Sequence, residues 1–416
     1  MRPILVNTYD LIGGAARAAY RLHQALRLIG LDSQLLVQRK VTDDPSVHGP
    51  RGPFAKAVAR ARPFLDSLPL WGYPSRLPGS FSPAVLPDSL APRIAALRGD
   101  LVHLHWVAGG FFNPTWLERS AKPVVWTLHD SWAFTGGCHV PGDCARYRDA
   151  CGACPALGSR RERDLSRGLF ERKQRAWARA SLHVVTPSRW LADAARSSAL
   201  LRGASIEVIP NPRDLARFKP ADPAAARDAL GLPRDRVFLL FGGVGSLSDP
   251  NKGFPLLAEA LARVAQGPRG RDIELLVAGE RRPEPAPELA VPARFLGPVH
   301  GDEAMARLMT ACDALVLPSL QENQPNMVVE AMACGRPSVA FRAAGLPELV
   351  AHQSTGYLAE PFQSEDLARG IEWLLGDGAR RLSLGEAARE RAVQDHDQES
   401  VAGRYGALYE RILAGA

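Results

Sequence analysis

Two series of short apolar segments, separated by helix-like patterns, constrain the fold of this chain most strongly. The first series comprises Ile4–Val6, Leu35–Val37, Leu101–His105, Val124–Leu128, His183–Thr186 and Glu207–Ile209. The second comprises Val237–Phe241, Glu274–Ala278, Arg294–Leu296, Ala314–Leu317 and Ser338–Phe341. Continuous apolar runs of this length are typical of parallel strands with both faces covered. Between them lie helical patterns such as Gly14–Ile29. The alternation predicts an α/β architecture of doubly wound sheets.

The two series are separated at Pro210–Asp214, where two prolines end the last strand of the first series. We expect a loop over Phe218–Pro233 before a new strand begins. A chain of 416 residues is also too long for a single core. The sequence therefore predicts two Rossmann-like domains, residues 1–209 and 210–397.

Two further segments complete the predicted organisation. Residues 39–92, rich in Pro, Gly and Arg, form a predicted insertion in the first domain with one short basic helix, Phe54–Leu65. Residues 398–416 are predicted to form a C-terminal helix, about Gln398–Leu413, that packs back on the first domain.

Composition and charge narrow the classes of partner. The net charge of +7 favours anionic partners such as nucleotides and phospholipid headgroups. The excess is spread along the chain and not gathered in a tail, so nucleic-acid binding is not predicted. No apolar run reaches the length of a membrane helix, and Met1–Val6 meets the polar Asn7 too early for a signal peptide. We therefore expect a cytoplasmic protein.

Two glycine-containing loops follow predicted strands. Gly13 and Gly14 open the first helix, where free N–H groups could meet an anion; a plain tight turn is the equal alternative. In the second domain, Gly242–Gly245, which includes Gly243, precedes Lys252 at the start of a helix. This order of strand, glycine loop and lysine is typical of a phosphate cradle, although a solvated lysine is the simpler alternative.

Two carboxylates mark the end of a later strand. Glu322 lies in the loop Pro318–Asn326, and Glu330 lies two turns along the following helix. Ligands of open α/β sheets bind at the carboxyl ends of strands. A carboxylate can accept hydrogen bonds from two vicinal hydroxyls, so the pair suits a sugar and a ribose. The alternatives are helix capping for Glu322 and a solvated helix face for Glu330.

A histidine follows a strand of the first domain. His129 lies in Trp126–Trp132, where it could donate a hydrogen bond to a reacting hydroxyl or a leaving oxygen. A single histidine is more often structural, but its place at a strand terminus favours a functional role.

Together these motifs resemble glycosyltransferase family 4, the large retaining family with the GT-B fold. The resemblance covers nearly the whole chain and is most specific in the two glutamates and Ala331–Pro337. It implies two Rossmann-like domains that face each other across a cleft holding a nucleotide-sugar donor. The block Leu128–His139 resembles a subset of bacterial exopolysaccharide and colanic-acid-type transferases.

The resemblance also implies roles for individual residues. The candidate catalytic residues are His129, Lys252 and Glu322. The implied donor-binding residues are Gly13, Gly14, Gly243, Lys252, Asn323, Gln324, Asn326 and Glu330, with Lys252 on the diphosphate and Glu330 on the ribose. Asp130 and Trp132 are expected on the acceptor side. Asn251 departs from the family, because many members carry arginine there.

The expected reaction needs no cofactor. No Asp-x-Asp pair follows a strand; the pair Asp395 and Asp397 lies in the C-terminal helical region and is expected to be solvated. The charge of the leaving group would then be met by Lys252, arginines and helix N-termini. The family implies retention by front-face attack. We therefore expect a retaining, metal-ion-independent glycosyltransferase that moves a sugar to a saccharide or lipid-linked saccharide acceptor in cell-surface polysaccharide biosynthesis.

Four of the six cysteines are clustered, at Cys138, Cys144, Cys151 and Cys154. In a reducing compartment, the Cys-x-x-Cys end with two nearby partners indicates a structural zinc site, and the intervening stretches of five, six and two residues differ from those of a standard zinc ribbon. Buried free thiols and two disulfides are the alternatives. Cys312 and Cys334 lie in apolar surroundings and are predicted to be core residues.

Two basic helices suggest an anionic membrane surface. The first carries an apolar stripe of Phe54, Val58, Ala61 and Leu65 among basic residues, Arg51, Lys56, Arg60 and Arg62. The second, Ser166–Ala180, carries Arg167, Arg172, Lys173, Arg175 and Arg179. Both could rest on the inner face of the plasma membrane and receive a lipid-linked acceptor. A solvated helix face is the alternative.

Two other functions stay open at this point. A nucleotide-sugar epimerase-like enzyme would use the same donor without an acceptor. A non-catalytic scaffold that binds sugar nucleotides would keep the fold but not the chemistry, and the presence of Lys252, Glu322 and Glu330 argues against it.

Overall fold

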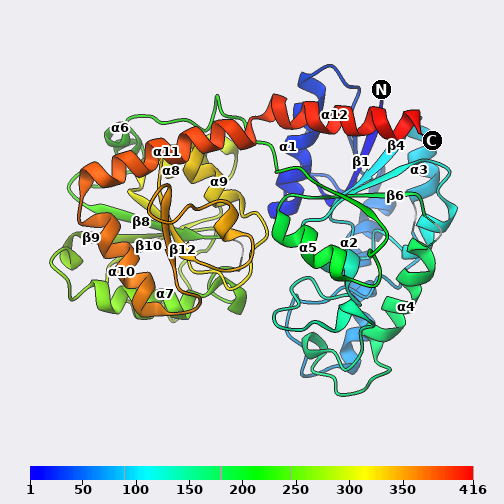
Figure 1. Ribbon diagram of the computed structural model, residues 1–416, viewed down its shortest axis with the longest axis horizontal. Helices are drawn as coiled ribbons and strands as arrows, with labels where there is room; N and C mark the ends of the chain where they lie inside the picture. The colour runs from blue at the N-terminus through cyan, green and yellow to red at the C-terminus, as the bar shows by residue number, and fades with distance from the viewer. Residues whose placement is uncertain (89, 179, 244, 416) are drawn as a thin grey trace. The chain divides into compact units, whose positions relative to one another are not determined.

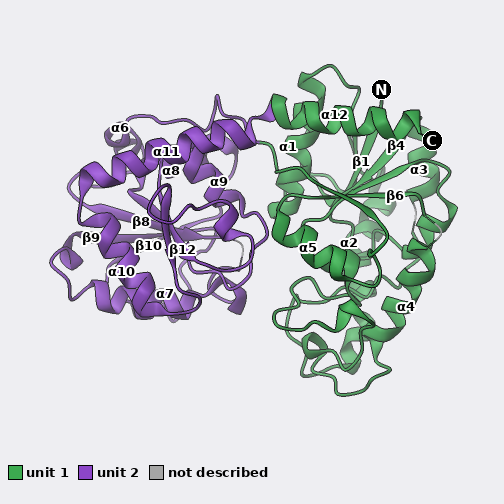
Figure 2. Ribbon diagram, viewed as in Figure 1, with its two compact units in different colours: residues 1–212, 399–416 green, residues 213–398 purple. Residues whose placement is uncertain are grey.

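The computed structural model describes residues 1–416 with the exception of Ser89, Arg179, Val244 and Ala416. Arg179 of the predicted second basic helix therefore lies outside the described residues. The chain divides into two compact units, unit 1 with residues 1–212 and 399–416, and unit 2 with residues 213–398 (Figure 2). Each unit contains one parallel sheet flanked by helices, which confirms the α/β prediction (Figure 1).

The sheet of unit 1 has seven strands in the order β3-β2-β1-β4-β5-β6-β7, and all pairings are parallel. The strands are β1 (Pro3–Tyr9), β2 (Gln34–Arg39), β3 (Val47–His48), β4 (Leu101–Leu104), β5 (Val124–Thr127), β6 (Leu182–Thr186) and β7 (Ser205–Val208). The order reverses between β1 and β4. In open α/β sheets this switch point is where ligands bind, at the carboxyl ends of the strands.

Unit 1 is completed by a helix from the far end of the chain. Its helices are α1 (Gly14–Leu28), α2 (Pro53–Ser67), α3 (Leu90–Leu97), α4 (Leu165–Trp177), α5 (Arg189–Ser197) and, from Glu399 onward, α12 (Gln398–Ala414). Val401, Tyr405 and Tyr409 of α12 share one hydrophobic cluster with Leu5 and Leu35 of the sheet. The C-terminal helix is therefore part of the core of unit 1.

Unit 2 repeats the same topology with six parallel strands in the order β10-β9-β8-β11-β12-β13. The strands are β8 (Val237–Gly242), β9 (Ile273–Ala278), β10 (Ala293–Gly297), β11 (Ala314–Leu317), β12 (Ser338–Phe341) and β13 (Gly356–Ala359). The helices are α6 (Pro223–Ala229), α7 (Phe254–Val264), α8 (Asp302–Ala311), α9 (Asn326–Ala333), α10 (Ser364–Leu375) and α11 (Gly378–His396). The switch point here lies between β8 and β11.

The prediction of a loop over Phe218–Pro233 is wrong, because α6 lies within it. The Asp222 carboxylate accepts hydrogen bonds from the amides of Ala224 and Ala225, and Pro223 occupies the first turn. Both features stabilise a helix N-terminus, so this short helix forms despite the flanking prolines.

Candidate functional site

A lysine and a glutamate meet at the switch point of unit 2. Lys252 follows β8, Glu322 follows β11, and Lys252 Nζ lies 2.6 Å from Glu322 Oε1. Both side chains are mostly buried, with exposed fractions of 23% and 16%. Burial alone would lower the pKa of Lys252, but the Glu322 carboxylate outweighs it and raises this pKa above its ordinary value. Lys252 is therefore a firmly held cation at a ligand-binding edge.

Close contacts to the backbone hold the Lys252 loop and the Glu322 loop together. The Asn251 side chain donates to the carbonyl of Gln321 and accepts from its amide, at 2.8 and 3.0 Å. Gly253 has a positive φ of 67°, and a Cβ there would lie 1.9 Å from the carbonyl oxygen of Pro318. Only glycine fits this approach. Asn251, which departs from the family pattern, thus joins the lysine loop to the glutamate loop.

Glu330 is buried, not solvated, in this structure. It is 1% exposed on α9, and its Oε1 accepts a hydrogen bond of 2.9 Å from Nη1 of the fully buried Arg213. Arg213 Nη2 donates to Asn326 Oδ1 at 2.8 Å, one helical turn before Glu330. Arg213 was not among the residues predicted from the sequence, where its only signal is a charged residue directly after Pro-Asn-Pro.

The remaining predicted donor residues of unit 2 surround these contacts. Asn323, Gln324 and Asn326 are half-buried in the loop that leads into α9. Gly243 follows β8 with a positive φ of 137°, and a Cβ there would lie 3.9 Å from Cε of Lys252. The structure thus gathers Gly243, Lys252 and Glu322 at one strand edge, with Glu330 on the helix that follows.

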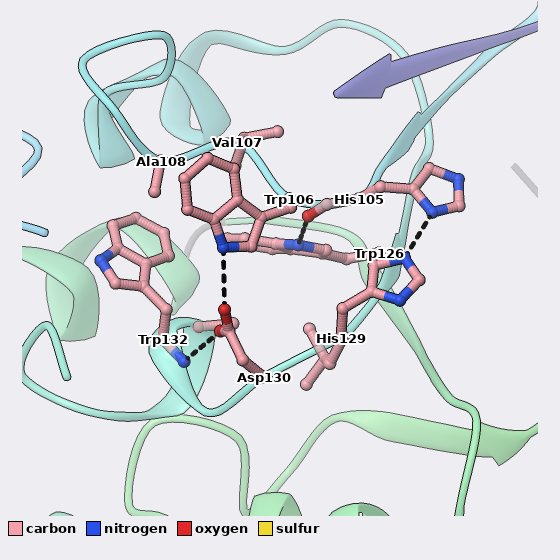
Figure 3. Close-up of a pocket in the computed structure, with 10 residues that line it drawn as sticks. His105, Trp106, Val107, Ala108, Trp126, His129, Asp130 and Trp132 are labelled. Atoms are coloured by element: carbon pink, nitrogen blue, oxygen red, sulfur yellow. Dashed lines mark hydrogen bonds between the residues drawn. The ribbon is translucent and has the colours of Figure 1, made fainter. Parts of the chain in front are cut away.

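A small pocket of unit 1 lies at the carboxyl ends of β4 and β5 (Figure 3). It is lined by His105, Trp106, Val107, Ala108, Trp126, Leu128, His129, Asp130, Trp132 and Ala133. His129 Nε2 lies 3.0 Å from Nδ1 of His105, and Figure 3 shows the two rings joined by this bond. Burial lowers the pKa of His129 to about 4, against the effect of Asp130. His129 is therefore neutral at pH 7.

Asp130 and Trp132 organise the wall of this pocket. Asp130 accepts hydrogen bonds from Trp106 Nε1 at 2.8 Å, the Trp132 amide at 2.8 Å and His139 Nδ1 at 2.7 Å. Burial would raise the pKa of Asp130, but His139 and these donors keep it below its ordinary value. Trp132 is 3% exposed. Their expected place on the acceptor side stays a prediction.

The glycine loop of unit 1 lies after β1. Gly13 precedes α1 with a φ of 91°, a conformation that favours glycine, and its carbonyl accepts from the Arg17 amide at 3.2 Å. Gly14 is exposed at the first position of the helix. This geometry is compatible with both the anion site and the plain turn.

Lys173 of the second predicted basic helix does not lie on a surface. It is 0% exposed, its Nζ donates to the carbonyls of Trp132 and Thr135, and the ammonium lies 3.5 Å from the ring centre of Trp132. Arg172 donates to the carbonyls of Pro83 and Ala84 at 2.8 Å. The prediction of a basic membrane face here is wrong for these two residues, because Lys173 holds the loop after His129 and Arg172 holds the segment at Pro83 and Ala84.

Most of the apolar and basic residues predicted to be exposed on the first basic helix are exposed in the structure. On α2, Phe54 is 82% exposed and Val58 41%, and Lys56 and Arg60 are exposed beside them. Arg62 departs from the prediction, because its guanidinium donates to the carbonyls of Gly110 and Pro87. No helix in the described part of the chain is both long and apolar enough to cross a bilayer.

The four clustered cysteines line one small pocket of unit 1, and all six cysteines are free thiols. Cys151 Sγ accepts a hydrogen bond of 3.1 Å from the Gly136 amide, and burial raises the pKa of Cys151 to about 12. Among the described residues, no group of three or more His, Cys, Asp and Glu side chains is arranged to hold a metal ion. Structural zinc stays a prediction. Cys312 and Cys334 are buried, as predicted.

The Asp-x-Asp pair lies at the end of α11. Asp395 is half-buried, 3.5 Å from Nε of Arg391, and the backbone of the half-buried Asp397 pairs with that of Arg213. The Asp395 side chain keeps an exposed fraction of 43%, in line with the expectation of a solvated residue, whereas Asp397 is half-buried and departs from it.

The sequence matches known families over both units. A profile described as "Glycosyltransferase Family 4" matches residues 12–217, and one described as "Glycosyl transferases group 1" matches residues 239–377. The D-inositol 3-phosphate glycosyltransferase of Mycobacterium sp. (strain JLS) is 32% identical over 307 residues, 71% of this chain. The chain spans only 62% of that relative's length. A protein of the same name from Geodermatophilus obscurus is 32% identical over 337 residues, which cover 76% of this chain and 68% of the length of that relative.

Solved structures share the architecture. Sucrose-phosphate synthase from Thermosynechococcus elongatus has a TM-score of 0.71 at 21% identity, over 100% of both chains. Anabaena HepE in complex with UDP and glucose has a TM-score of 0.65 at 18% identity, over 99% of both chains. These similarities confirm the predicted GT-B fold class. Together with the two profiles and the Geodermatophilus relative, they show that the chain belongs to glycosyltransferase family 4.

Proposed function

We propose that this protein transfers a sugar from a nucleoside-diphosphate sugar, with retention at the anomeric carbon, to a saccharide or lipid-linked saccharide acceptor. The observation that carries the proposal is the Lys252–Glu322 pair, 2.6 Å apart at the switch point of the unit 2 sheet. The reaction would belong to the synthesis of a cell-surface polysaccharide.

Charge supports a diphosphate leaving group at this pair. The carboxylate of Glu322 neutralises Lys252. A bound diphosphate would compete for the same ammonium and leave Glu322 to accept hydrogen bonds from sugar hydroxyls. Because Lys252 supplies the compensating charge, we propose that transfer needs no metal ion. The acceptor proton would pass to a donor phosphate oxygen, so no protein nucleophile is required.

The neighbouring residues complete the proposed donor site. Glu322 and the backbone of residues 323–326 would hold the sugar, and Glu330 the ribose. HepE, which shares the fold, was solved in complex with UDP and glucose, so a UDP-sugar is the first donor to examine. For unit 1 we propose that Gly14, at the N-terminus of α1, binds an anion and that His129 donates a hydrogen bond to a substrate oxygen.

A ligand screen followed by product analysis tests this proposal. A nucleotide sugar that binds the folded protein raises its melting temperature by mass action, so thermal shift across a panel identifies the donor. The product made with saccharide, lipid-linked and inositol phosphate acceptors is then examined by NMR for its anomeric configuration, with and without EDTA. We expect retention and equal rates in both buffers; inversion, or loss of activity with EDTA, contradicts the mechanism.

Two control reactions separate the alternatives. An epimerase-like enzyme would convert the donor without any acceptor, so donor alone is incubated in parallel. A scaffold would bind the donor without turnover. We expect Glu322→Ala to lose transfer while Arg307→Ala, an exposed position on α8, keeps it; undiminished transfer by Glu322→Ala would remove our site assignment.

We also propose that the cysteine cluster holds structural zinc. All four thiols line one pocket, and backbone amides lie against the sulfurs of Cys151 and Cys154. These amide donors oppose the burial that raises the pKa of both thiols, and a bound zinc ion would supply the further charge that favours the thiolate form. Binding would require the side chains to reorient, since the described residues present no ready metal site.

Finally, we propose that α2 docks the protein on the anionic inner face of the plasma membrane, where a lipid-linked acceptor would be found. Its exposed apolar residues continue beyond Phe54 to Phe64 and, after the helix, to Trp71, at 57% and 63% exposed. Arg51, Lys56 and Arg60 are exposed beside them. The single acidic residue of the helix, Asp66, is buried and accepts the amides of residues 84–86. This face therefore combines apolar and cationic groups, as an interfacial helix does.

A further inference from the structure

His105 lies between His129 and the core of unit 1. It directly follows β4, and its ring stacks on His129 with centroids 5.3 Å apart and an interplanar angle of 21°. On its other side the ring of His103 lies 4.2 Å away. Figure 3 shows His105 and His129 joined at the edge of the pocket. His129 thus receives its orientation partly from a buried neighbour.

His103, which packs against His105 on the side of the core, is held by hydrogen bonds. His103 Nδ1 lies 2.6 Å from the hydroxyl of Tyr409, and its Nε2 lies 2.8 Å from Thr127 Oγ1. The hydroxyl of Tyr405 lies 2.9 Å from the same Thr127 oxygen. These contacts tie His103 to α12, so the surface against which His105 packs is held in place.

The hydrogen bonds of His105 decide where its proton lies. A neutral imidazole has one donor and one acceptor nitrogen. His105 is 3% exposed, and its Nε2 has no hydrogen-bond partner among the described residues. If the proton were on Nε2, a buried N–H would be left unpaired, which native structures rarely tolerate. The proton therefore belongs on Nδ1, where it is donated to His129 Nε2 at 3.0 Å.

We infer that His105 is a positioning residue that fixes the tautomer of His129. Because His129 Nε2 accepts this bond, the proton of the neutral ring lies on Nδ1, and His129 acts on an oxygen of the substrate as a donor through Nδ1–H. The same logic operates wherever an orienting partner selects the tautomer of an imidazole. The inference rests on the proposed function for the role of His129, but the tautomer itself does not depend on activity.

Two matched substitutions test the positioning role. In His105→Asn the side-chain amide nitrogen occupies the place of Nδ1 and keeps the donor, whereas in His105→Gln the amide lies near the place of Nε2 and the donor is lost. We expect His105→Asn to keep kcat within about threefold and His105→Gln to lower kcat by roughly tenfold to a hundredfold, with the donor KM unchanged. Equal kcat values for the two variants, whether both high or both low, overturn the inference.

A measurement on the unaltered protein covers the case in which a variant fails to fold or no transfer is found. Nitrogen-15 NMR of histidine-labelled protein distinguishes a protonated ring nitrogen from a bare one, and a His129→Gln sample assigns the signals. We expect His129 protonated on Nδ1 and His105 on Nδ1 at pH 7. A proton on Nε2 of His129 overturns the inference even if the protein is an active transferase, and the expected result stands even if it is not.

Discussion

Arg213 and Glu330 form a buried ion pair, with Nη1 of Arg213 and Oε1 of Glu330 2.9 Å apart and side-chain exposures of 0% and 2%. The same guanidinium reaches Asn326, and the backbone amide of Arg213 donates to the carbonyl of His396 at 2.7 Å. At the start of unit 2, the Arg213 side chain thus holds the helix of the proposed ribose contact, and its backbone amide holds the end of α11.

Removal of Arg213 should therefore destabilise unit 2. Breaking a buried pair leaves an uncompensated charge and costs about 3–5 kcal/mol. We expect Arg213→Met to lower the free energy of unfolding by that amount in urea titrations, and Arg213→Met with Glu330→Leu to recover part of it.

The matched control is an exposed pair. Arg307 and Glu303 lie 3.4 Å apart with side-chain exposures of 46% and 83%. Arg307→Met should change stability by no more than about 0.5 kcal/mol, since solvent screens such pairs. Similar losses for Arg213→Met and Arg307→Met would show that the buried pair has no special weight.

Lys252 should dominate nucleotide affinity. A hydrogen bond to a charged group contributes about 1.5–3 kcal/mol, which corresponds to roughly tenfold to 150-fold in Kd. We expect calorimetry to show this loss of UDP affinity in Lys252→Met and a smaller loss in Lys252→Arg. Wild-type affinity in Lys252→Met would place the diphosphate elsewhere.

The sequence predicted the strands well because both faces of each sheet are buried, which turns a strand into an apolar run. Strands that depend on tertiary contacts were not predicted from the sequence. β3 has only two residues, and β13 contains Gly356, where a Cβ would lie 2.2 Å from the carbonyl oxygen of Ser338. Its close backbone approach to β12, and not its composition, makes it a strand.

Buried histidines predict a loss of stability in acid. His23 is 0% exposed between Ser33 and Ser46, and burial lowers its pKa to about 4 despite the opposing Asp44. Between about pH 6.5 and pH 4 the unfolded chain binds a proton that the folded chain does not, so stability falls as the pH falls.

One such histidine changes the free energy of unfolding by at most about 1.4 kcal/mol per pH unit. We expect His23→Gln to show a shallower decline in urea stability over this range, while His300→Gln, at an exposed position of unit 2, keeps the wild-type decline. Parallel curves for wild type and His23→Gln would mean that His23 titrates normally in the folded protein.

The site was predictable where its motifs are local and not where its partners are distant in sequence. Lys252 and Glu322 were expected from their loops, and the structure pairs them. Lys173 looked like a surface cation, since its sequence neighbours are charged, yet it lies under Trp132. The pairing of His105 with His129 depends on the adjacency of β4 and β5, which no single-sequence pattern displays.

The cysteine pocket makes a prediction about metal content. Protein purified without chelator should contain zinc in a one-to-one ratio by mass spectrometry, and Cys154→Ser should lose it, because a structural site needs four ligands. Cys312→Ser, in the core of unit 2, should retain the metal. Metal-free protein with wild-type stability would leave buried thiols as the correct interpretation.

The surface of α2 makes the last prediction. Vesicles that contain phosphatidylglycerol should sediment the protein, and vesicles of phosphatidylcholine alone should not, because each basic residue near an anionic surface contributes about 1 kcal/mol. Phe54→Ser with Trp71→Ser should lower the bound fraction severalfold by removing the apolar contact. Raising the salt to about 0.5 M should also lower it, since the Debye length shortens.

A control from the other unit separates specific docking from general stickiness. Leu382 of α11 is 67% exposed, comparable to Trp71, but lies in unit 2. Leu382→Ser should bind vesicles like the wild type, because a single apolar residue outside the basic face adds little. If Leu382→Ser loses as much binding as the α2 variant, or if salt has no effect, the combination of charge and apolar surface on α2 is not what holds the protein at the membrane.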